Sequence, residues 1–288
     1  CSYCAIPLIR GDARSRDPLD VADEARELAA RGIFELNLVG QDLGSYGLDT
    51  LGRQALPELL DRICRLDGDF RIRMLYIHPD RFPLSILDVC ARDPRVLPYF
   101  DIPFQHASTS VLKAMNRKGD AETYLRLVGS IRDRLPDAVL RSTFLVGFPG
   151  ETEEDFSALL DFQDRARLDW LGAFEYSREE GTPAASFPGR VPKRTAALRR
   201  RAVEEAQRPL TESRLRRFLG RDLEILVEEP VEGEDLSIGR SYAQAPEVDG
   251  LVVVNARLDP GRVVRARVTA VNGVDLEAAL YTPPSPVP

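Results

Sequence analysis

The chain has 288 residues, of which 39 are basic and 46 acidic, so its formal net charge is −7. It is 43% hydrophobic and 30% charged, which is typical of a globular protein and excludes a disordered or fibrous one. No apolar run approaches the roughly 18 residues that a transmembrane helix needs, and the acidity argues weakly against broad nucleic-acid binding. Four cysteines, at positions 1, 4, 64 and 90, are too few for a disulfide framework, so we expect a reduced, cytoplasmic protein.

Helix-like and strand-like segments alternate through the first two thirds of the chain. Asp17-Pro18 and Arg31-Gly32 are start and stop signals for the first helix, and Thr152 with Asp155 resembles a capping box. The predicted strands are 34–40, 71–77, 99–102, 139–147 and 170–177, and the predicted helices are 18–30, 55–66, 84–92, 108–115, 120–134 and one starting near 150. This alternation predicts an α/β fold of parallel βαβ units. Five strands are fewer than the eight of a complete barrel, so we expect an incomplete open barrel.

The composition changes after residue 190. Residues 193–217 form a predicted helix with nine basic and three acidic residues. Five short strands follow near 222–228, 236–242, 250–255, 262–271 and 274–280, separated by turn signals, and they predict a small antiparallel β-barrel. We therefore expect a first domain over 1–190, a basic connecting helix over 191–218, a barrel domain over 219–282 and a disordered tail over 283–288.

Polar or glycine-rich residues follow four of the five predicted parallel strands. They are Gly40-Gln41-Asp42, His78-Pro79, Gln105-His106 and the run from Gly147 to Glu151. Ligands of α/β sheets collect beyond the carboxyl ends of the strands, so these residues are candidates for a binding site. Turns are rich in such residues in any case, and a histidine at a strand end is about as often structural as functional.

Cys1 and Cys4 form a C-x-x-C pair, whose thiolates are close enough to bind one metal centre. The pair is also compatible with a redox dithiol or with half of a zinc site. Cys64 and Cys90 are isolated on helix-like segments, and we interpret them as core residues.

Six motifs together resemble one family, the radical S-adenosylmethionine (SAM) methylthiotransferases. The motifs are CSYCAIPLIRGDARSR (1–16), LNLVGQDLGSYG (36–47), DIPFQHAS (101–108), NRKG (116–119), STFLVGFPGETEEDF (142–156) and EYSREEGTPAA (175–185). The first resembles the end of the family's C-x-x-x-C-x-x-C loop, and the C-terminal barrel resembles the TRAM module that ends these enzymes. The resemblance covers nearly the whole chain.

Within the family, RGDARSR, PFQH and GRSYAQAPEVDG (239–250) are most like the enzymes that methylthiolate the β-carbon of an aspartate in a small-subunit ribosomal protein. Residues 219–288 hold 12 acidic and 6 basic residues, whereas 1–218 hold 34 and 33. An acidic module suits a basic ribosomal protein better than RNA, although it is also compatible with an ordinary solvated surface. The alternatives are a tRNA adenosine methylthiotransferase and a non-catalytic scaffold that binds ribosomal protein. Contact of the basic helix with ribosomal RNA is a secondary expectation beside simple packing.

The resemblance also implies cofactors and site residues. Three cysteines would hold a 4Fe-4S cluster that binds and cleaves SAM, and the resulting radical would abstract hydrogen from the substrate carbon. Cys1 and Cys4 match the last two cluster ligands, and no further side chain is assigned a catalytic role. For SAM, we expect the amino group to contact Gly40, Gln41 and Asp42, and the carboxylate to contact Arg141. The adenine or ribose is expected to contact the backbone of Gly147–Glu151. Gln105 and His106 are expected to be polar residues of the pocket.

The family's first cluster cysteine would lie four positions before Cys1. The first barrel strand and an N-terminal domain with a second 4Fe-4S cluster would precede it as well. The resemblance therefore implies that this chain is an N-terminally truncated fragment, which we expect not to cleave SAM by itself.

Overall fold

The structure, a computed structural model, describes residues 1–280 and forms two compact units. The units are Cys1–Ala206 and Gln207–Pro288. The tail predicted to be disordered, 283–288, lies outside the described residues.

The first unit is built on a five-stranded parallel sheet with the strand order β1-β2-β3-β4-β5. The strands are β1 (Glu35–Val39), β2 (Arg71–Leu75), β3 (Val96–Asp101), β4 (Val139–Val146) and β5 (Trp170–Glu175). Each of them falls on a predicted strand, and their order along the sheet is their order along the chain. The α/β fold with an open, incomplete barrel is confirmed.

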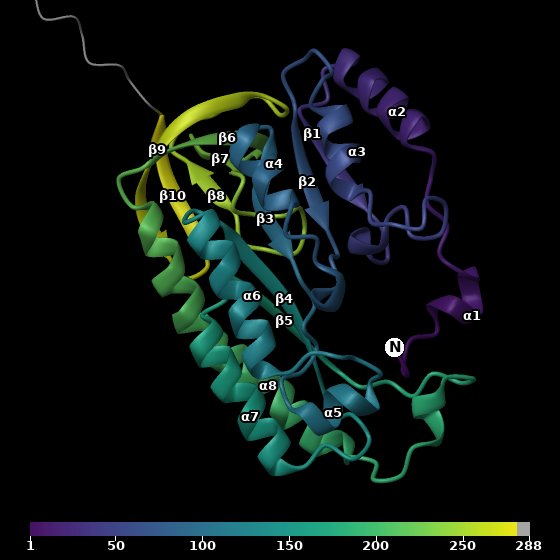
Figure 1. The fold of residues 1–288 in the computed structure, drawn as a ribbon. Coiled ribbons are helices and arrows are strands. Elements are labelled where there is room, and N and C mark those ends of the chain that lie inside the picture. The colour runs from purple at the N-terminus through teal and green to yellow at the C-terminus, as the bar shows by residue number, and fades with distance from the viewer. Residues whose placement is uncertain (281–288) are drawn as a thin grey trace, which may run out of the picture. The chain divides into compact units, whose positions relative to one another are not determined.

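Helices cover one face of this sheet, and α4 and α6 lie in front of β3 and β4 in Figure 1. The helices are α1 (Ile6–Arg10), α2 (Pro18–Ala30), α3 (Leu56–Ile63), α4 (Ile86–Arg92), α5 (Thr109–Ala114), α6 (Ala121–Arg134) and α7 (Glu153–Ala166), with short 3-10 helices η1 (Leu43–Ser45), η2 (Pro79–Arg81) and η3 (Pro183–Ser186). The predicted start signals act as expected: Asp17 accepts a hydrogen bond from the Leu19 backbone N–H, and Thr152 and Asp155 form the capping box of α7.

The two faces of the sheet differ in character because side chains alternate along each strand. One face carries Leu36, Ile72 and Phe144, which belong to the main hydrophobic core. The other face carries buried charged groups: Arg73 Nε lies 3.0 Å from Glu35 Oε1, and the Arg73 guanidinium lies 4.7 Å from the centre of the Tyr99 ring. Buried ion pairs of this kind are expensive to desolvate and are retained only when both partners are satisfied.

The second unit is a closed five-stranded barrel with the strand order β10-β8-β7-β6-β9. Its strands are β6 (Asp222–Pro230), β7 (Ser237–Arg240), β8 (Val252–Val254), β9 (Val263–Asn272) and β10 (Asp275–Leu280). Leu223, Ile225 and Val227 alternate with exposed residues along β6 and are buried, which is the pattern of a filled barrel.

One strand pair differs from the antiparallel barrel that the sequence predicts, because β8 and β10 are parallel. The other four neighbouring pairs are antiparallel. A closed ring with an odd number of strands cannot alternate direction at every pair, so one parallel pair is required.

Helix α8 (Lys193–Leu215) continues across the division between the two units, and η4 (Arg216–Phe218) follows it. Gln207, Thr211 and Leu215, spaced four residues apart, are buried, so the last turns of the helix belong to the second unit. The sequence placed the limits of the helix segment at 191 and 218, whereas the structure divides the chain inside the helix.

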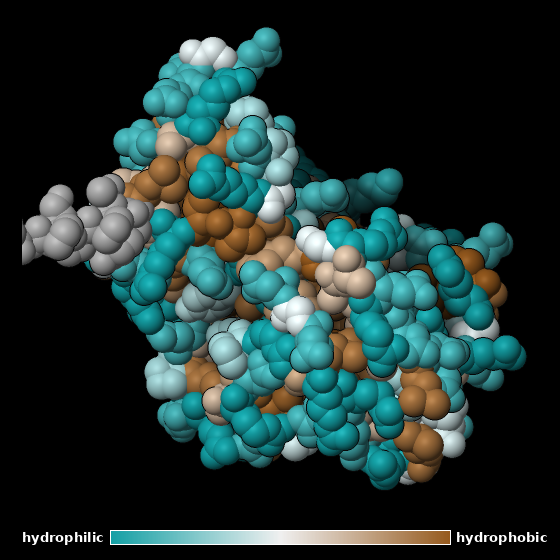
Figure 2. Space-filling model, turned by 90° about the horizontal axis from the view of Figure 1, so that it is seen from above, coloured by the Kyte–Doolittle hydropathy of each residue, from teal (hydrophilic) through white to brown (hydrophobic). Residues whose placement is uncertain are grey.

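No helix among residues 1–280 is long and apolar enough to cross a membrane. Figure 2 shows a largely hydrophilic face on which hydrophobic residues occur in separate patches.

Candidate functional site

Cys1 and Cys4 lie in one tight turn at the start of the chain. The Cys4 backbone N–H donates to the Cys1 carbonyl oxygen at 3.4 Å, and the Cys1 side chain is exposed while Cys4 is half-buried. Both are free thiols. Two thiols from one turn suit iron, a metal that protein thiolates commonly hold.

Cys64 and Cys90 lie elsewhere, at the end of α3 and within α4. Burial raises the pKa of both thiols to about 12, so they stay protonated and are poor ligands. Within residues 1–280 there is no group of three His, Cys, Asp or Glu side chains that could hold a metal ion. The turn therefore offers two thiolates, which fit part of the ligand set of an iron–sulfur cluster.

The Gly40–Asp42 segment follows β1, but its carboxylate is already engaged. Asp42 caps η1 by accepting from the Gly44 backbone N–H at 3.0 Å, and it accepts from the His78 backbone N–H at 3.0 Å. Arg81 Nη1 lies 3.2 Å from the other Asp42 oxygen. Asp42 thus joins the loops after β1 and β2, which leaves exposed Gln41 and the backbone as the groups this segment presents outward.

His78, at the end of β2, is part of the same junction. Its Nδ1 accepts from the Asp80 backbone N–H at 3.2 Å. Burial and the nearby Arg117 lower the pKa of His78 to about 4, so the imidazole is neutral at pH 7.

Gln105 and His106, predicted as a pair of pocket residues, have different surroundings. Gln105 has a φ of 69° and is half-buried, and its backbone extends the sheet by bonding to Thr143 O and to the Leu145 N–H. The His106 side chain is fully buried, its Nδ1 accepts from the Ser108 N–H at 3.0 Å, and its Nε2 lies 3.9 Å from Glu151 Oε2. The structure therefore does not place His106 in an open pocket, because its ring is enclosed by the loop after β4.

Arg141 lies near the beginning of β4, six residues before Gly147. At ~3.3 Å per residue, about 20 Å of strand separates Arg141 from that loop. Its Nη1 contacts Asp101 Oδ1 at 3.1 Å, and the Arg141 side chain is only 11% exposed. The structure thus gives Arg141 a carboxylate partner inside the protein and does not bring it to the loop after β4.

The Gly147–Glu151 loop is rigid for reasons that can be read from its residues. Gly147 has a φ of 75°, and a Cβ there would lie 2.6 Å from Ala196 Cβ, so only glycine fits. Glu151 Oε2 accepts from the Phe148 backbone N–H at 3.1 Å, and Arg199 Nη1 of α8 binds Glu151 Oε1 at 2.8 Å. The Glu151 carboxylate holds the turn from inside, and of the five loop residues only Gly150 is exposed.

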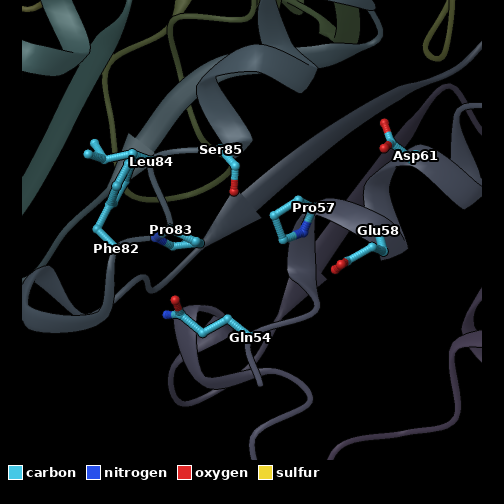
Figure 3. A pocket seen from close by; sticks show the side chains of 8 residues that line it. All are labelled: Gln54, Pro57, Glu58, Asp61, Phe82, Pro83, Leu84 and Ser85. Atoms are coloured by element: carbon cyan, nitrogen blue, oxygen red, sulfur yellow. The ribbon is translucent and has the colours of Figure 1, made fainter. Parts of the chain in front are cut away.

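A pocket of about 520 Å³ lies beside the junction of Asp42 and Arg81, because its lining residue Gln54 donates to the Arg81 carbonyl oxygen at 2.6 Å. Phe82, Pro83 and Leu84 line one side of it, and Pro57 and Glu58 line another (Figure 3). No residue predicted for the site lines it.

The sequence interpretation did not identify three buried polar residues near the cysteine turn or the Gly147–Glu151 loop: Ser2, Arg117 and Arg199. Arg199 lies in a helix interpreted only as basic, and its pairing with Glu151 spans 48 residues. The NRKG motif was noticed for its resemblance alone, and nothing in its pattern indicated that Arg117 is buried.

Comparison with known proteins agrees with this arrangement. Residues 1–162 match the radical SAM superfamily, and residues 219–280 match the TRAM domain. Ribosomal protein uS12 methylthiotransferase RimO of Treponema denticola is 46% identical over 308 aligned positions, which cover 96% of this chain and 66% of that protein. RimO of Moorella thermoacetica is 47% identical over 270 positions, which cover 93% and 61%.

The fold has solved counterparts at low identity. Coproporphyrinogen III oxidase (HemN) from Escherichia coli, a radical SAM enzyme, superposes with a TM-score of 0.51 at 18% identity, over 74% of this chain and 50% of that one. This likeness shows a shared fold and nothing more.

The chain spans 61 to 66% of the length of these two curated relatives. The superfamily match covers more than half of the chain and includes the cysteine turn and the strand ends described above. This chain belongs to the radical SAM superfamily and carries a TRAM domain at its C-terminal end.

Proposed function

We propose that this chain is part of a methylthiotransferase that adds a methylthio group to the β-carbon of an aspartate in a small-subunit ribosomal protein of the uS12 type. The observation that carries the proposal is the similarity to RimO, which extends through both units and covers 93 to 96% of the chain. Superfamily membership implies SAM and a 4Fe-4S cluster as cofactors. A second cluster, held by residues outside this chain, is part of the proposal.

Cys1 and Cys4 are the residues of this chain that would hold the cluster. When bound, the cluster supplies the electron that cleaves SAM and so makes hydrogen abstraction from an unactivated carbon accessible. The chain's own contribution is positioning. Gly150 is the exposed residue of the Gly147–Glu151 loop at the end of β4, and Gln41 offers an exposed amide at the end of β1.

The acidic residues of the second unit support the proposal that its partner is a basic protein. Five acidic residues lie within eight positions of the β6–β7 hairpin, and all five are exposed: Glu228, Glu229, Glu232, Glu234 and Asp235. Opposite charge raises association rates, whereas RNA would be repelled by such a surface.

The test uses the protein that the gene encodes, reconstituted with iron and sulfide under anaerobic conditions and supplied with SAM and a reductant. Incubation with uS12 and, separately, with tRNA is followed by mass spectrometry. We expect the mass gain of one methylthio group on an aspartate of uS12. A gain on tRNA adenosine instead would establish the alternative substrate, and binding of uS12 without any mass gain would indicate a scaffold.

A further inference from the structure

The Cys1–Cys4 turn is attached to the protein through the residue that follows Cys1. The Ser2 backbone N–H donates to Met115 O at 3.0 Å, and Ser2 Oγ donates to Ala114 O at 2.7 Å. These carbonyls end helix α5, where the last carbonyl groups have no partner inside the helix. Ser2 is 8% exposed, so both bonds are sheltered from water.

A second contact holds the turn from the side of η3. The Ala184 backbone N–H donates to Ser2 O at 2.9 Å, so all the backbone hydrogen-bonding groups of Ser2 are used. Thr182, which precedes η3, is itself fixed by a bond from its Oγ to Glu179 O at 2.7 Å. The GTPAA segment (181–185), which ends the EYSREEGTPAA motif, thus contacts the cysteine turn, although this segment contains no metal ligand.

Tyr3 packs the cysteine turn against a small hydrophobic cluster. Its ring meets the edge of Phe148 with 6.2 Å between ring centres, and it packs against the cluster that includes Val111 and Met115.

Arg117 connects the residues that receive the Ser2 hydrogen bonds to the end of β3. It is 7% exposed, and its Nη1 donates to the Pro103 carbonyl oxygen at 2.8 Å. The backbone before it turns sharply at Asn116, which has a φ of 61°, and the Arg117 N–H closes the turn on Leu112 O at 2.8 Å. One buried side chain therefore ties the segment that receives the Ser2 hydrogen bonds to the end of β3.

We propose that the end of α5 and the NRKG turn, residues 114–117, form the seat of the cluster-binding loop, with Arg117 as a positioning residue that fixes the Cys1–Cys4 turn against the end of β3. The chain's first residues lie beside α5 in Figure 1, as these contacts require. The inference rests on the proposed function, since the turn is taken to hold the cluster. It gives the NRKG and GTPAA motifs a role in shaping the turn before any metal binds.

The test measures amide hydrogen exchange in the protein that the gene encodes, prepared without iron. We compare the wild type with Arg117→Leu, and use Arg132→Leu as a matched control because Arg132 also binds two backbone carbonyls, of Ala166 and Arg167, at 2.8 and 2.7 Å. In R117L we expect peptides covering residues 1–5 to exchange about tenfold faster, which is the loss of roughly one hydrogen bond's worth of protection. R132L should leave these peptides unchanged.

The proposal is overturned if residues 1–5 of R117L exchange at the wild-type rate, even if residues 101–119 exchange faster. If R117L does not fold, Ser2→Ala removes only the Oγ bond to Ala114, and Arg117→Lys keeps the charge. S2A should speed exchange at 1–5 by a few fold and R117K by less than R117L, and wild-type rates in both would refute the seat.

Iron and sulfide analysis after reconstitution separates this inference from the proposed function. If the seat is correct, R117L loses its cluster faster than wild type under a chelator. If no variant assembles a cluster while exchange at 1–5 still responds to R117L, the proposed function fails and the seat stands.

Discussion

At the scale of single residues, the shape of the loop after β4 depends on a buried ion pair between Glu151 and Arg199. Glu151 has no exposed side-chain area, and Arg199 has 8%. Burial raises the pKa of Glu151, and the nearby Arg199 partly offsets this rise. The carboxylate also anchors the Phe148 N–H, so one side chain controls both the charge balance and the shape of the loop.

We predict that Glu151→Gln lowers the free energy of unfolding by about 2 kcal/mol, because Arg199 loses its buried carboxylate partner and keeps only the exposed Glu153, 3.0 Å from Nη2. Urea denaturation followed by circular dichroism measures the change. As a control, Glu205→Gln in α8, the helix that carries Arg199, breaks an exposed ion pair with Arg201 and should lower the free energy of unfolding by less than about 0.5 kcal/mol. Equal effects of the two substitutions would contradict this prediction.

His106 makes the stability of the protein depend on pH. Burial lowers its pKa to about 4, below the unfolded value of 6.5. Between these values the unfolded chain binds more protons than the folded one, so stability falls as pH drops through the window. We expect a loss approaching ~1.4 kcal/mol per pH unit from this residue, measured by urea unfolding at pH 7, 5.5 and 4.5. His106→Asn, whose side-chain oxygen can still accept from the Ser108 N–H, should reduce the slope without abolishing it, because the pKa of His78 is also lowered to about 4. An unchanged slope would assign the dependence to His78 and other groups.

At the scale of elements, charge is segregated within the barrel. The β6–β7 hairpin is acidic, whereas β9 carries Arg265 and Arg267, and Arg267 binds Asp222 of β6 at 2.7 Å. The excess negative charge of the second unit therefore gathers on one hairpin, where it is available to a partner.

We predict that the triple charge reversal Glu229→Lys, Glu232→Lys and Glu234→Lys slows association with uS12 about tenfold at low salt and that this difference shrinks as salt screens it. Stopped-flow or surface plasmon resonance measurements at several salt concentrations would show it. The matched control reverses Glu154, Asp161 and Asp164, which are exposed on α7. If both triples slow association equally, net charge rather than the hairpin is responsible.

At the scale of the whole molecule, each unit has its own core. The first unit is organised by the sheet and its helices, and the second by a barrel that leaves no strand edge unpaired. The helix α8 is divided between them, with Thr211 and Leu215 buried near its end.

We predict that residues 207–288 expressed alone unfold in one cooperative thermal transition, whereas 219–288 melt at a lower temperature because the buried last turns of α8 are missing. Circular dichroism melts of the two segments provide the comparison. Equal melting temperatures would show that these turns do not belong to the barrel's core.

Local sequence determined the secondary structure of this protein well. Capping residues, turn residues and apolar periodicity act over a few positions, so the predicted strands and helices coincide with β1–β10 and α2–α8 to within a few residues. The one parallel pair in the barrel, β8 with β10, follows from ring closure, which no single segment encodes. Short-range patterns also found the cysteine pair and the Gly147–Glu151 loop.

Tertiary structure decided what the polar side chains do. His106 and Glu151 stand at strand ends, as a ligand-binding residue would, but α8 brings Arg199 from 48 positions away and encloses the Glu151 carboxylate. Arg117 has the sequence surroundings of a surface residue, yet it is buried and its side chain donates to the Pro103 carbonyl oxygen after β3. A side chain's exposure and partners depend on segments distant in the chain. The sequence therefore determined which strand ends and which cysteine pair are candidates for the site, and the fold decided which of their side chains are exposed and which are buried.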